Sequence, residues 1–299
     1  MPMRFIACPG QGSQTVGFLI PWIEQVPGFK EKMQTLGEAC GKDLIWLGTE
    51  ADEETIKDTS NSQPLIVAAG IAAVRTLLSE LEFDGVVGHS VGEFTAAAVA
   101  GVLSDEDAMR LVSMRANAMA EASSREQTSM AAVLGGEEER VLATLEALGL
   151  YAANFNGAGQ IVAAGAKSEI LKLVAGPPEK SRVIELKVAG AFHTEYMKSA
   201  EDLLESNISN IKVADPRTIL ISNQAGQRVE SGSDFLSLML KQVSRPVRWD
   251  KCMETLNALG GTLIELPPAG ALSGLAKRGM ENVTAIALKG PSDIEKIGG

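Results

Sequence analysis

The chain has 299 residues, 45% of them hydrophobic and 22% charged, as in an ordinary globular protein with a full core. It carries 27 basic and 38 acidic residues, a net charge of -11. That balance excludes nucleic acid and membrane surfaces as general partners, because both polyanions would be repelled by most of the protein surface.

The first part of the chain alternates short apolar runs, bounded by glycine, with segments of helical period. This pattern predicts an α/β architecture with a largely parallel sheet. Ser104 starts a capping-box sequence and predicts a helix over 105–121. The other elements expected before it are a strand at 4–8, a glycine-rich turn at 9–14, a helix at 63–81, a strand at 85–89 and a helix at 91–100.

The middle of the chain has a different order of elements, after a polar stretch at 122–129. We expect strands at 130–135, 151–156, 160–164 and 182–188, and helices at 137–148 and 168–175. The order βαββαβ is that of a ferredoxin-like unit. We therefore predict a small subdomain at residues 126–189, inserted into a larger one made of residues 1–125 and 190–299.

The α/β pattern returns after residue 190. The elements expected there are a helix at 195–204, a strand at 218–222, a helix at 235–241, a strand at 262–266 and a helix after the turn at 267–270.

Gly88-His89-Ser90-Val91-Gly92 is a G-x-S-x-G sequence placed between a predicted strand and a predicted helix. In that context it predicts a nucleophile elbow, a sharp turn that exposes a serine at the N-terminus of a helix. The helix end directs free N–H groups and a positive dipole toward charge that develops near Ser90. The alternative is a serine in an ordinary strand–helix turn.

A serine nucleophile needs a base, and the chain has two histidines. His89 adjoins Ser90, so along a strand the two side chains leave opposite faces. His193 is therefore the predicted base. Neither Asp215 nor Asp250 lies in a context that favours a third catalytic member. A backbone or amide carbonyl could orient the imidazole instead, so we predict a dyad.

Arg115 lies on the apolar face of the helix predicted from residue 105. A guanidinium stays charged and is costly to bury without a partner. It either snorkels or joins an internal salt bridge, or it binds a substrate carboxylate through two parallel hydrogen bonds. Both interpretations stay open at this point.

Two features of the sequence point away from a cofactor. The loop Gly10-Gln11-Gly12-Ser13-Gln14 matches neither the dinucleotide nor the P-loop pattern, and is expected to donate a backbone N–H to an oxyanion. Cys8, Cys40 and Cys252 have no metal-ligand spacing and are expected to be free thiols. We predict no metal and no cofactor.

The sequence also bears on where the protein is found in the cell. The sequence before Cys8 lacks the apolar run of a secretion signal, and no segment approaches the ~18 apolar residues of a membrane span. We expect a cytoplasmic protein, in monomeric form.

These motifs occur together and in order with Gly190-Ala191-Phe192-His193, with Gln242 ahead of Pro246-Val247-Arg248-Trp249, and with Asn154-Phe155-Asn156-Gly157. The joint pattern closely resembles the malonyl-CoA:acyl carrier protein transacylases of bacterial fatty acid synthesis. The resemblance implies an α/β-hydrolase-like subdomain with a ferredoxin-like insertion and an active site between them.

The resemblance also implies roles for single residues. Ser90 would be the nucleophile and His193 its base. Gln11 and Val91 would form the oxyanion hole with their backbone N–H groups. Arg115 would hold the malonyl carboxylate, and the carbonyl of Gln242 would orient His193. Phe192 favours malonyl over methylmalonyl.

The expected function is therefore transfer of malonyl from CoA, a substrate here, to the phosphopantetheine thiol of acyl carrier protein, by a ping-pong mechanism through malonyl-serine. Because carrier proteins are acidic, docking would need exposed basic residues; the candidates are Lys180, Arg182, Lys187, Arg245, Lys277 and Arg278. The alternatives are a serine thioesterase or esterase, a non-catalytic carrier-binding relative, and an acyltransferase of a polyketide pathway.

Overall fold

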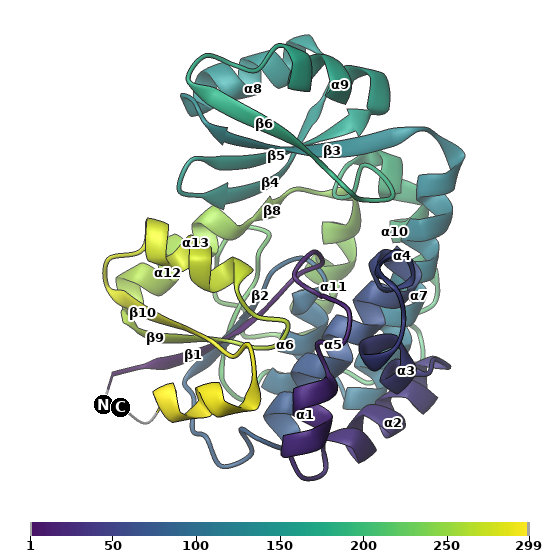
Figure 1. The fold of residues 1–299 in the computed structure, drawn as a ribbon, viewed down its shortest axis with the longest axis vertical. Coiled ribbons are helices and arrows are strands. Elements are labelled where there is room, and N and C mark those ends of the chain that lie inside the picture. The colour runs from purple at the N-terminus through teal and green to yellow at the C-terminus, as the bar shows by residue number, and fades with distance from the viewer. Residues whose placement is uncertain (1, 298–299) are drawn as a thin grey trace.

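Two five-stranded sheets organise the chain in the computed structural model, which describes residues 2–297. The larger subdomain surrounds a parallel sheet, and the smaller one, at the top of Figure 1, surrounds a mainly antiparallel sheet. No helix within residues 2–297 has the length and apolar character needed to cross a membrane. The predicted fold class, an α/β-hydrolase-like subdomain with a ferredoxin-like insertion, is confirmed.

The parallel sheet has the strand order β10-β9-β1-β2-β7. On β1, Phe5 and Ala7 enter one hydrophobic core while Ile6 and Cys8 enter another, so both faces of the sheet are covered. A strand buried on both faces needs a continuous apolar run, which is why residues 4–8 were recognisable from sequence. The strands are β1 (Arg4–Cys8), β2 (Gly85–Gly88), β7 (Ile219–Ile221), β9 (Gly261–Glu265) and β10 (Val283–Ala287).

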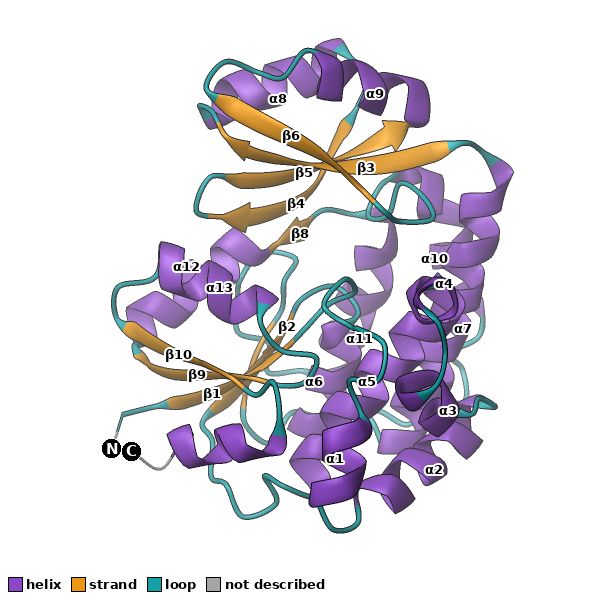
Figure 2. Ribbon diagram, viewed as in Figure 1, coloured by secondary structure: helices purple, strands orange, loops and turns teal. Residues whose placement is uncertain are grey.

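Helices cover the two faces of the parallel sheet (Figure 2). On one face lie α12 (Trp249–Leu259) and α13 (Ala271–Gly279), which share a core with Phe5 and Ala7. The other helices are α1 (Ile20–Gln25), α2 (Phe29–Cys40), α3 (Leu44–Thr49), α4 (Glu53–Lys57), α5 (Thr59–Arg75), α6 (Gly92–Ala100), α7 (Asp105–Arg125), α10 (Lys198–Ser206) and α11 (Gly232–Lys241), with 3-10 turns η1 (Glu195–Met197), η2 (Gln242–Ser244) and η3 (Pro291–Ile297).

The small sheet has the order β6-β3-β5-β4-β8. Its first four strands and two helices have the ferredoxin-like arrangement: β3 (Thr128–Gly135), α8 (Glu138–Ala147), β4 (Tyr151–Gly157), β5 (Gln160–Ala166), α9 (Lys167–Ala175) and β6 (Ser181–Leu186). The fifth strand, β8 (Val247–Arg248), comes from the later part of the chain and runs parallel to β4. The boundaries 126 and 189 stay a prediction.

Residues along β3 alternate between the two faces of the small sheet. Ala131 and Val133 belong to the core under α8 and α9, whereas Met130 and Ala132 line a cleft between the subdomains. The small sheet therefore supplies one wall of this cleft.

The structure corrects several predicted elements. The segment 20–57, left without prediction, forms the twelve-residue α2 and the three short helices α1, α3 and α4. Helix α12 and strands β8 and β10 were also missed. The helix predicted at 63–81 runs from Thr59 to Arg75, and α7 continues to Arg125 instead of 121. The longer α7 is explained by burial, because Ala122 and Ser123 face the interior although their segment is polar.

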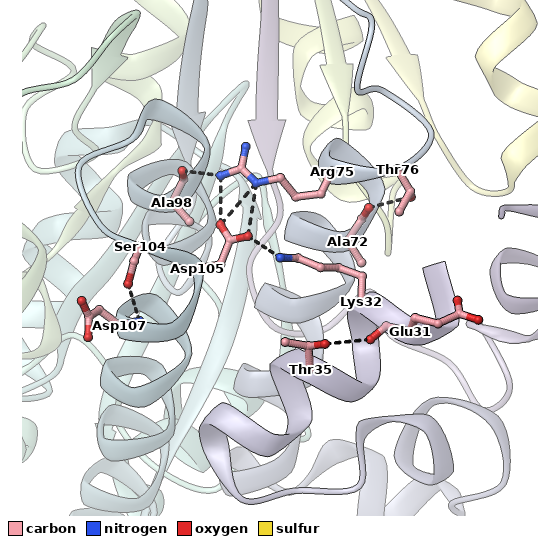
Figure 3. Close-up of polar contacts among 10 residues, drawn as sticks. All are labelled: Glu31, Lys32, Thr35, Ala72, Arg75, Thr76, Ala98, Ser104, Asp105 and Asp107. Atoms are coloured by element: carbon pink, nitrogen blue, oxygen red, sulfur yellow. Dashed lines mark hydrogen bonds and ion pairs between the residues drawn. The ribbon is translucent and has the colours of Figure 1, made fainter. Parts of the chain in front are cut away.

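A cluster of charged residues fixes the start of α7 (Figure 3). Asp105 accepts hydrogen bonds from Arg75 of α5, with Nη2 at 2.9 Å, and pairs with Nζ of Lys32 of α2 at 2.6 Å. Arg75 also donates to the carbonyl of Ala98 in α6 at 2.9 Å. Ser104 caps the helix by accepting from the N–H of Asp107, as predicted. Four helices are thereby joined at one point.

Candidate active site

Ser90 lies on a sharp turn between β2 and α6. Its φ is 52°, a left-handed conformation that is rare for a residue other than glycine. A Cβ on Gly88 would come within 2.3 Å of the backbone nitrogen of Glu93, and one on Gly92 within 2.1 Å of the carbonyl oxygen of Cys8. The two glycines of the motif are therefore required by close backbone approach, and the strained serine is presented at a helix N-terminus.

The structure brings the predicted base to the serine. Oγ of Ser90 lies 2.7 Å from Nε2 of His193, and Nδ1 of His193 lies 2.8 Å from the carbonyl oxygen of Gln242. Because a carbonyl only accepts, Nδ1 carries the proton and Nε2 is free to accept from the serine. His193 also has a left-handed φ, 61°, so both partners of the dyad are held in strained conformations.

His193 is 4% exposed, and its surroundings disfavour the charged imidazolium. Burial, with the nearby Arg115 guanidinium as a second cause, lowers the pKa of His193 to about 3. The imidazole is therefore neutral near pH 7, the state in which it can take a proton. Asp215 and Asp250 serve elsewhere: the first accepts from the N–H of Gly232, and the second pairs with Arg248.

Arg115 is wholly buried and reaches the serine from α7. Its Nη1 donates to Oε1 of Gln63 at 2.7 Å, and its Nη2 donates to Oε1 of Gln242 at 3.0 Å and to Oγ of Ser90 at 3.4 Å. Burial lowers the pKa of Arg115 to about 9, so the side chain stays charged near pH 7. It does not snorkel, and within residues 2–297 it forms no direct salt bridge. Of the two interpretations, the geometry favours carboxylate binding.

Two residues near the serine, from separate elements, have free backbone N–H groups. Val91 is the N-cap of α6 and directly follows Ser90, and Gln11 lies in the glycine-rich loop after β1 and lines the same cleft as Ser90. Among the described residues, neither N–H has a hydrogen-bond acceptor. Free donors at these positions are the requirement of an oxyanion hole. That role of Gln11 and Val91 stays a prediction.

The cleft around Ser90 has a volume of about 410 Å³ and is lined by both subdomains. Gln11, Gln63 and Phe192 belong to the larger one, and Asn154 and Asn156 of β4 to the smaller. The size is that of a small-molecule site, and the walls combine apolar residues with polar ones from both subdomains. Arg115 and Gln242 lie behind this lining.

His89 connects the two sides of the cleft. Its Nε2 lies 3.0 Å from Oδ1 of Asn156, and its ring packs edge-on against Trp249. A Cβ on Gly10 would come within 2.8 Å of the His89 ring, so the loop after β1 must be glycine there. His89 is thus oriented away from Ser90, as expected.

Sequence analysis missed three polar residues at the site. Gln63 pairs with Arg115, while Glu93 and Asn223 surround the side chain of Gln242. Glu93 is marked in the sequence as the one charged residue of the helix α6. Gln63 and Asn223 carry no such mark, since a polar residue near a helix start or strand end is common.

No cluster of three or more histidine, cysteine or acidic residues suited to a metal occurs within residues 2–297. Cys8 and Cys252 are buried free thiols. Burial raises the pKa of both, which makes them poor nucleophiles.

Comparison with known proteins places this geometry in a family. The acyl transferase domain family matches residues 5–292. The malonyl CoA-acyl carrier protein transacylase of Mycobacterium tuberculosis is 46% identical over 300 residues, which cover 99% of each chain.

Solved structures agree with this match. A crystal structure of MCAT from Mycobacterium tuberculosis, 45% identical, has a TM-score of 0.95 and covers 99% of this chain and 100% of its own. A malonyl-transacylase in complex with AntF, a type II PKS acyl-carrier protein, is 27% identical, has a TM-score of 0.92, and covers 98% of each chain. The chain therefore belongs to the acyl transferase family, among the malonyl CoA-acyl carrier protein transacylases.

Proposed function

We propose that the chain transfers a malonyl group from CoA to the phosphopantetheine thiol of an acyl carrier protein, for fatty acid biosynthesis. The observation that carries the proposal is the convergence on Oγ of Ser90 of a neutral imidazole at 2.7 Å and a buried guanidinium at 3.4 Å. The first activates a nucleophile. The second is the group that distinguishes malonyl, with its free carboxylate, from uncharged acyl groups.

In the first half-reaction, Oγ of Ser90 attacks the thioester carbonyl while Nε2 of His193 takes the hydroxyl proton. The oxyanion of the tetrahedral intermediate accepts hydrogen bonds from the N–H groups of Gln11 and Val91. When the carbon–sulfur bond breaks, His193 returns the proton to the CoA sulfur, and malonyl-Ser90 remains. One oxyanion donor is typically worth ~10²–10³ in rate.

In the second half-reaction, the phosphopantetheine thiol gives its proton to His193 and its sulfur attacks the ester carbonyl. The carbon–oxygen bond to Ser90 then breaks, and His193 returns the proton to Oγ. The enzyme is restored, and the malonyl group is again a thioester. Throughout both steps the backbone carbonyl of Gln242 accepts a hydrogen bond from the Nδ1–H group of His193.

Mass spectrometry of the intact protein tests this proposal. Mixing with malonyl-CoA alone should add one malonyl group at Ser90, and adding carrier protein in its phosphopantetheine form should remove it and load the carrier. The Ser90→Ala variant should gain nothing. Release of free malonate without carrier would favour a thioesterase, and no adduct at all would favour a non-catalytic carrier-binding protein.

The carrier itself can belong to fatty acid or polyketide synthesis. The 46% identity with the Mycobacterium tuberculosis transacylase favours the first, against 27% for the malonyl-transacylase bound to a PKS carrier. A comparison of loading rates for the two kinds of carrier decides between them. Cytoplasmic location, a monomeric form and the lack of a cofactor remain predictions from the sequence.

A further inference from the structure

Glu93 is a fully buried carboxylate beside the catalytic dyad. It follows Ser90 by three residues and lies in the first turn of α6. The other eight residues of this nine-residue helix are uncharged and also buried. A buried carboxylate is costly unless several hydrogen bonds compensate for lost water. The presence of a carboxylate at this position therefore calls for a physical reason.

Both oxygens of Glu93 accept hydrogen bonds. Oε1 accepts from the N–H of Asn223 at 2.8 Å and from the hydroxyl of Ser222 at 3.1 Å. Oε2 accepts from Nε2 of Gln242 at 2.7 Å. The first oxygen is fixed to the segment after β7, and the second faces the residue whose carbonyl orients His193.

The contact fixes which way the Gln242 amide points. A carboxylate only accepts, so the amide must turn its NH₂ group to Glu93; a guanidinium only donates, so the amide must turn its oxygen to Arg115. Nε2 of Gln242 also lies 3.1 Å from the carbonyl oxygen of Ser90, and Oε1 lies 3.0 Å from Nη2 of Arg115. An amide between an anion and a cation has one favourable orientation.

We propose that Glu93 is a positioning residue that fixes the Gln242 amide and thereby sets Ser90, His193 and Arg115 relative to one another. Gln242 contacts all three, through its NH₂ group, its backbone carbonyl and its side-chain oxygen respectively. The side chain of Glu93 does not line the cleft, and its contact toward the dyad and Arg115 is the one to Gln242. The inference rests on the proposed function, because it explains how the same dyad and guanidinium are held.

The arrangement also supplies a negative charge near Arg115 without occupying the N–H groups of the guanidinium. Glu93 reaches Arg115 only through Gln242, and the guanidinium itself contacts only uncharged oxygens. A direct salt bridge would compete with a substrate carboxylate for the same N–H groups. A carboxylate separated by one amide stabilises the buried positive charge and leaves it free to bind.

The test measures the first-order rate constant of Ser90 acylation by rapid quenching and intact mass spectrometry, with malonyl-CoA and with acetyl-CoA. Glu93→Gln keeps the size of the side chain but can place an NH₂ group toward Gln242. The new NH₂ group then either faces the NH₂ group of Gln242 or forces the Gln242 amide to flip. We expect the rate constant to fall about 10- to 100-fold with both substrates, because small misplacements of reacting groups have effects of that order. An Arg115 variant, by contrast, should affect malonyl selectively.

The control is Asp105→Asn, which neutralises a partly buried carboxylate of the same subdomain, at the first residue of α7 and with no contact to Gln242. A rate constant does not depend on how much protein is folded, so a merely structural role for Glu93 would leave it at the wild-type value, as expected for Asp105→Asn. If Glu93→Gln does not fold, Glu93→Asp serves instead, since its shorter carboxylate cannot reach Gln242 and the same loss is expected.

Two results are distinguishable. Wild-type protein that forms no malonyl-Ser90 would overturn the proposed function and this inference with it. If the wild-type protein is acylated and the Glu93 variant is acylated at the wild-type rate by each substrate, this inference alone would be overturned.

Discussion

The helix α7 holds charge in two different ways along its length. At its start, Asp105 pairs directly with Arg75 and Lys32, and the three side chains are 16%, 38% and 26% exposed (Figure 3). Further along, Arg115 is 0% exposed and contacts amide and hydroxyl oxygens instead of a carboxylate. In the first cluster both cations pair directly with the carboxylate of Asp105, whereas Arg115 has no carboxylate partner within residues 2–297.

The difference indicates what each cluster is for. Paired charges near the surface contribute modestly to stability and recruit no ligand. A buried guanidinium with polar but uncharged partners is less stable than it would be with an anion, so it favours binding one. The same helix thus contacts α2 and α5 through its first turn, and in its middle carries the guanidinium that we propose binds the substrate carboxylate.

The largest expected effect is a selective loss of activity with malonyl-CoA, which should follow from removing Arg115 but not from removing Arg75. Arg115→Ala should lower kcat/KM for malonyl-CoA by about 10²-fold or more, because the substrate carboxylate then loses a buried cationic partner, a difference of about 3 kcal/mol or more. Acetyl transfer should change by less than about 10-fold. Steady-state rates with both thioesters measure the ratio.

Arg75→Ala is the matched control, because it removes an arginine of the same subdomain that pairs with α7. It should lower stability and leave the ratio of malonyl to acetyl transfer unchanged. An equal loss of both activities in Arg115→Ala would mean that this arginine, too, is structural.

The next effect concerns pH. Burial raises the pKa of Glu93 to about 7, with Arg115 of α7 and the thiol of Cys252 of α12 as its charged and titratable neighbours. As pH falls through 7, Glu93 takes up a proton and stops acting as a pure acceptor. Acylation by acetyl-CoA should therefore drop about 10-fold between pH 8 and pH 5, toward the rate of Glu93→Gln.

His193 cannot cause this drop, because its pKa lies near 3 and it stays neutral across the range. In Glu93→Gln the rate should accordingly be flat from pH 5 to pH 8. A persisting acid limb in that variant would assign the titration to His193 and contradict the depressed pKa.

A smaller effect is expected at the other cluster. Asp105→Asn removes the charge-assisted bonds from Arg75 and Lys32 and should lower the free energy of unfolding by about 1–2 kcal/mol at pH 7. Asp107→Asn, two residues along, loses only a longer contact to the exposed Arg110 and should cost less than about 0.5 kcal/mol. Urea unfolding at fixed pH compares them.

The sign of the pH dependence follows from the pKa of Asp105. Burial raises that pKa, but the hydrogen bonds from Arg75 and Lys32 outweigh burial and bring it below 3.8. The stabilisation is therefore complete above about pH 4 and is lost as pH falls through the folded-state pKa. A difference between Asp105→Asn and wild type that grew in acid would contradict this assignment.

The fold was predictable where one residue pattern dictates one structure. The buried run at residues 4–8 and the βαββαβ order of the small subdomain were both found. Within 20–57, α1, α3 and α4 were not, because elements of five or six residues show less than two turns of period. The twelve-residue α2 was missed although it buries Phe29, Met33 and Leu36 at helical spacing. Strand β8 has two residues and forms only through its partner β4, so no local signal exists.

The site was predictable where chemistry limits the choice. With two histidines in the chain, elimination placed His193 beside Ser90, and the distance of 2.7 Å agrees. Glu93 escaped because its role depends on Gln242, 149 residues away, and periodicity contains nothing about such contacts. The one local sign of such a contact is a charged residue in an otherwise uncharged, buried helix.

The smallest expected effect concerns the carrier protein. All six candidate basic residues are exposed, but only Arg278 also lines the cleft, at the last turn of α13 beside Lys277. Reversing both to glutamate should raise KM for an acidic carrier about 3- to 10-fold and weaken its salt dependence, because rim charges act mainly on association. Malonyl-CoA acylation of Ser90 should change less.

The control reverses two exposed lysines that do not line the cleft, Lys30 of α2 and Lys212, and so makes the same change in net charge. If charge acted only through the whole-molecule field, both double variants would impair carrier loading equally. A selective effect of Lys277 and Arg278 would mean instead that the carrier approaches over α13. That route leads directly to the cleft formed by the two subdomains, where its thiol must reach Ser90.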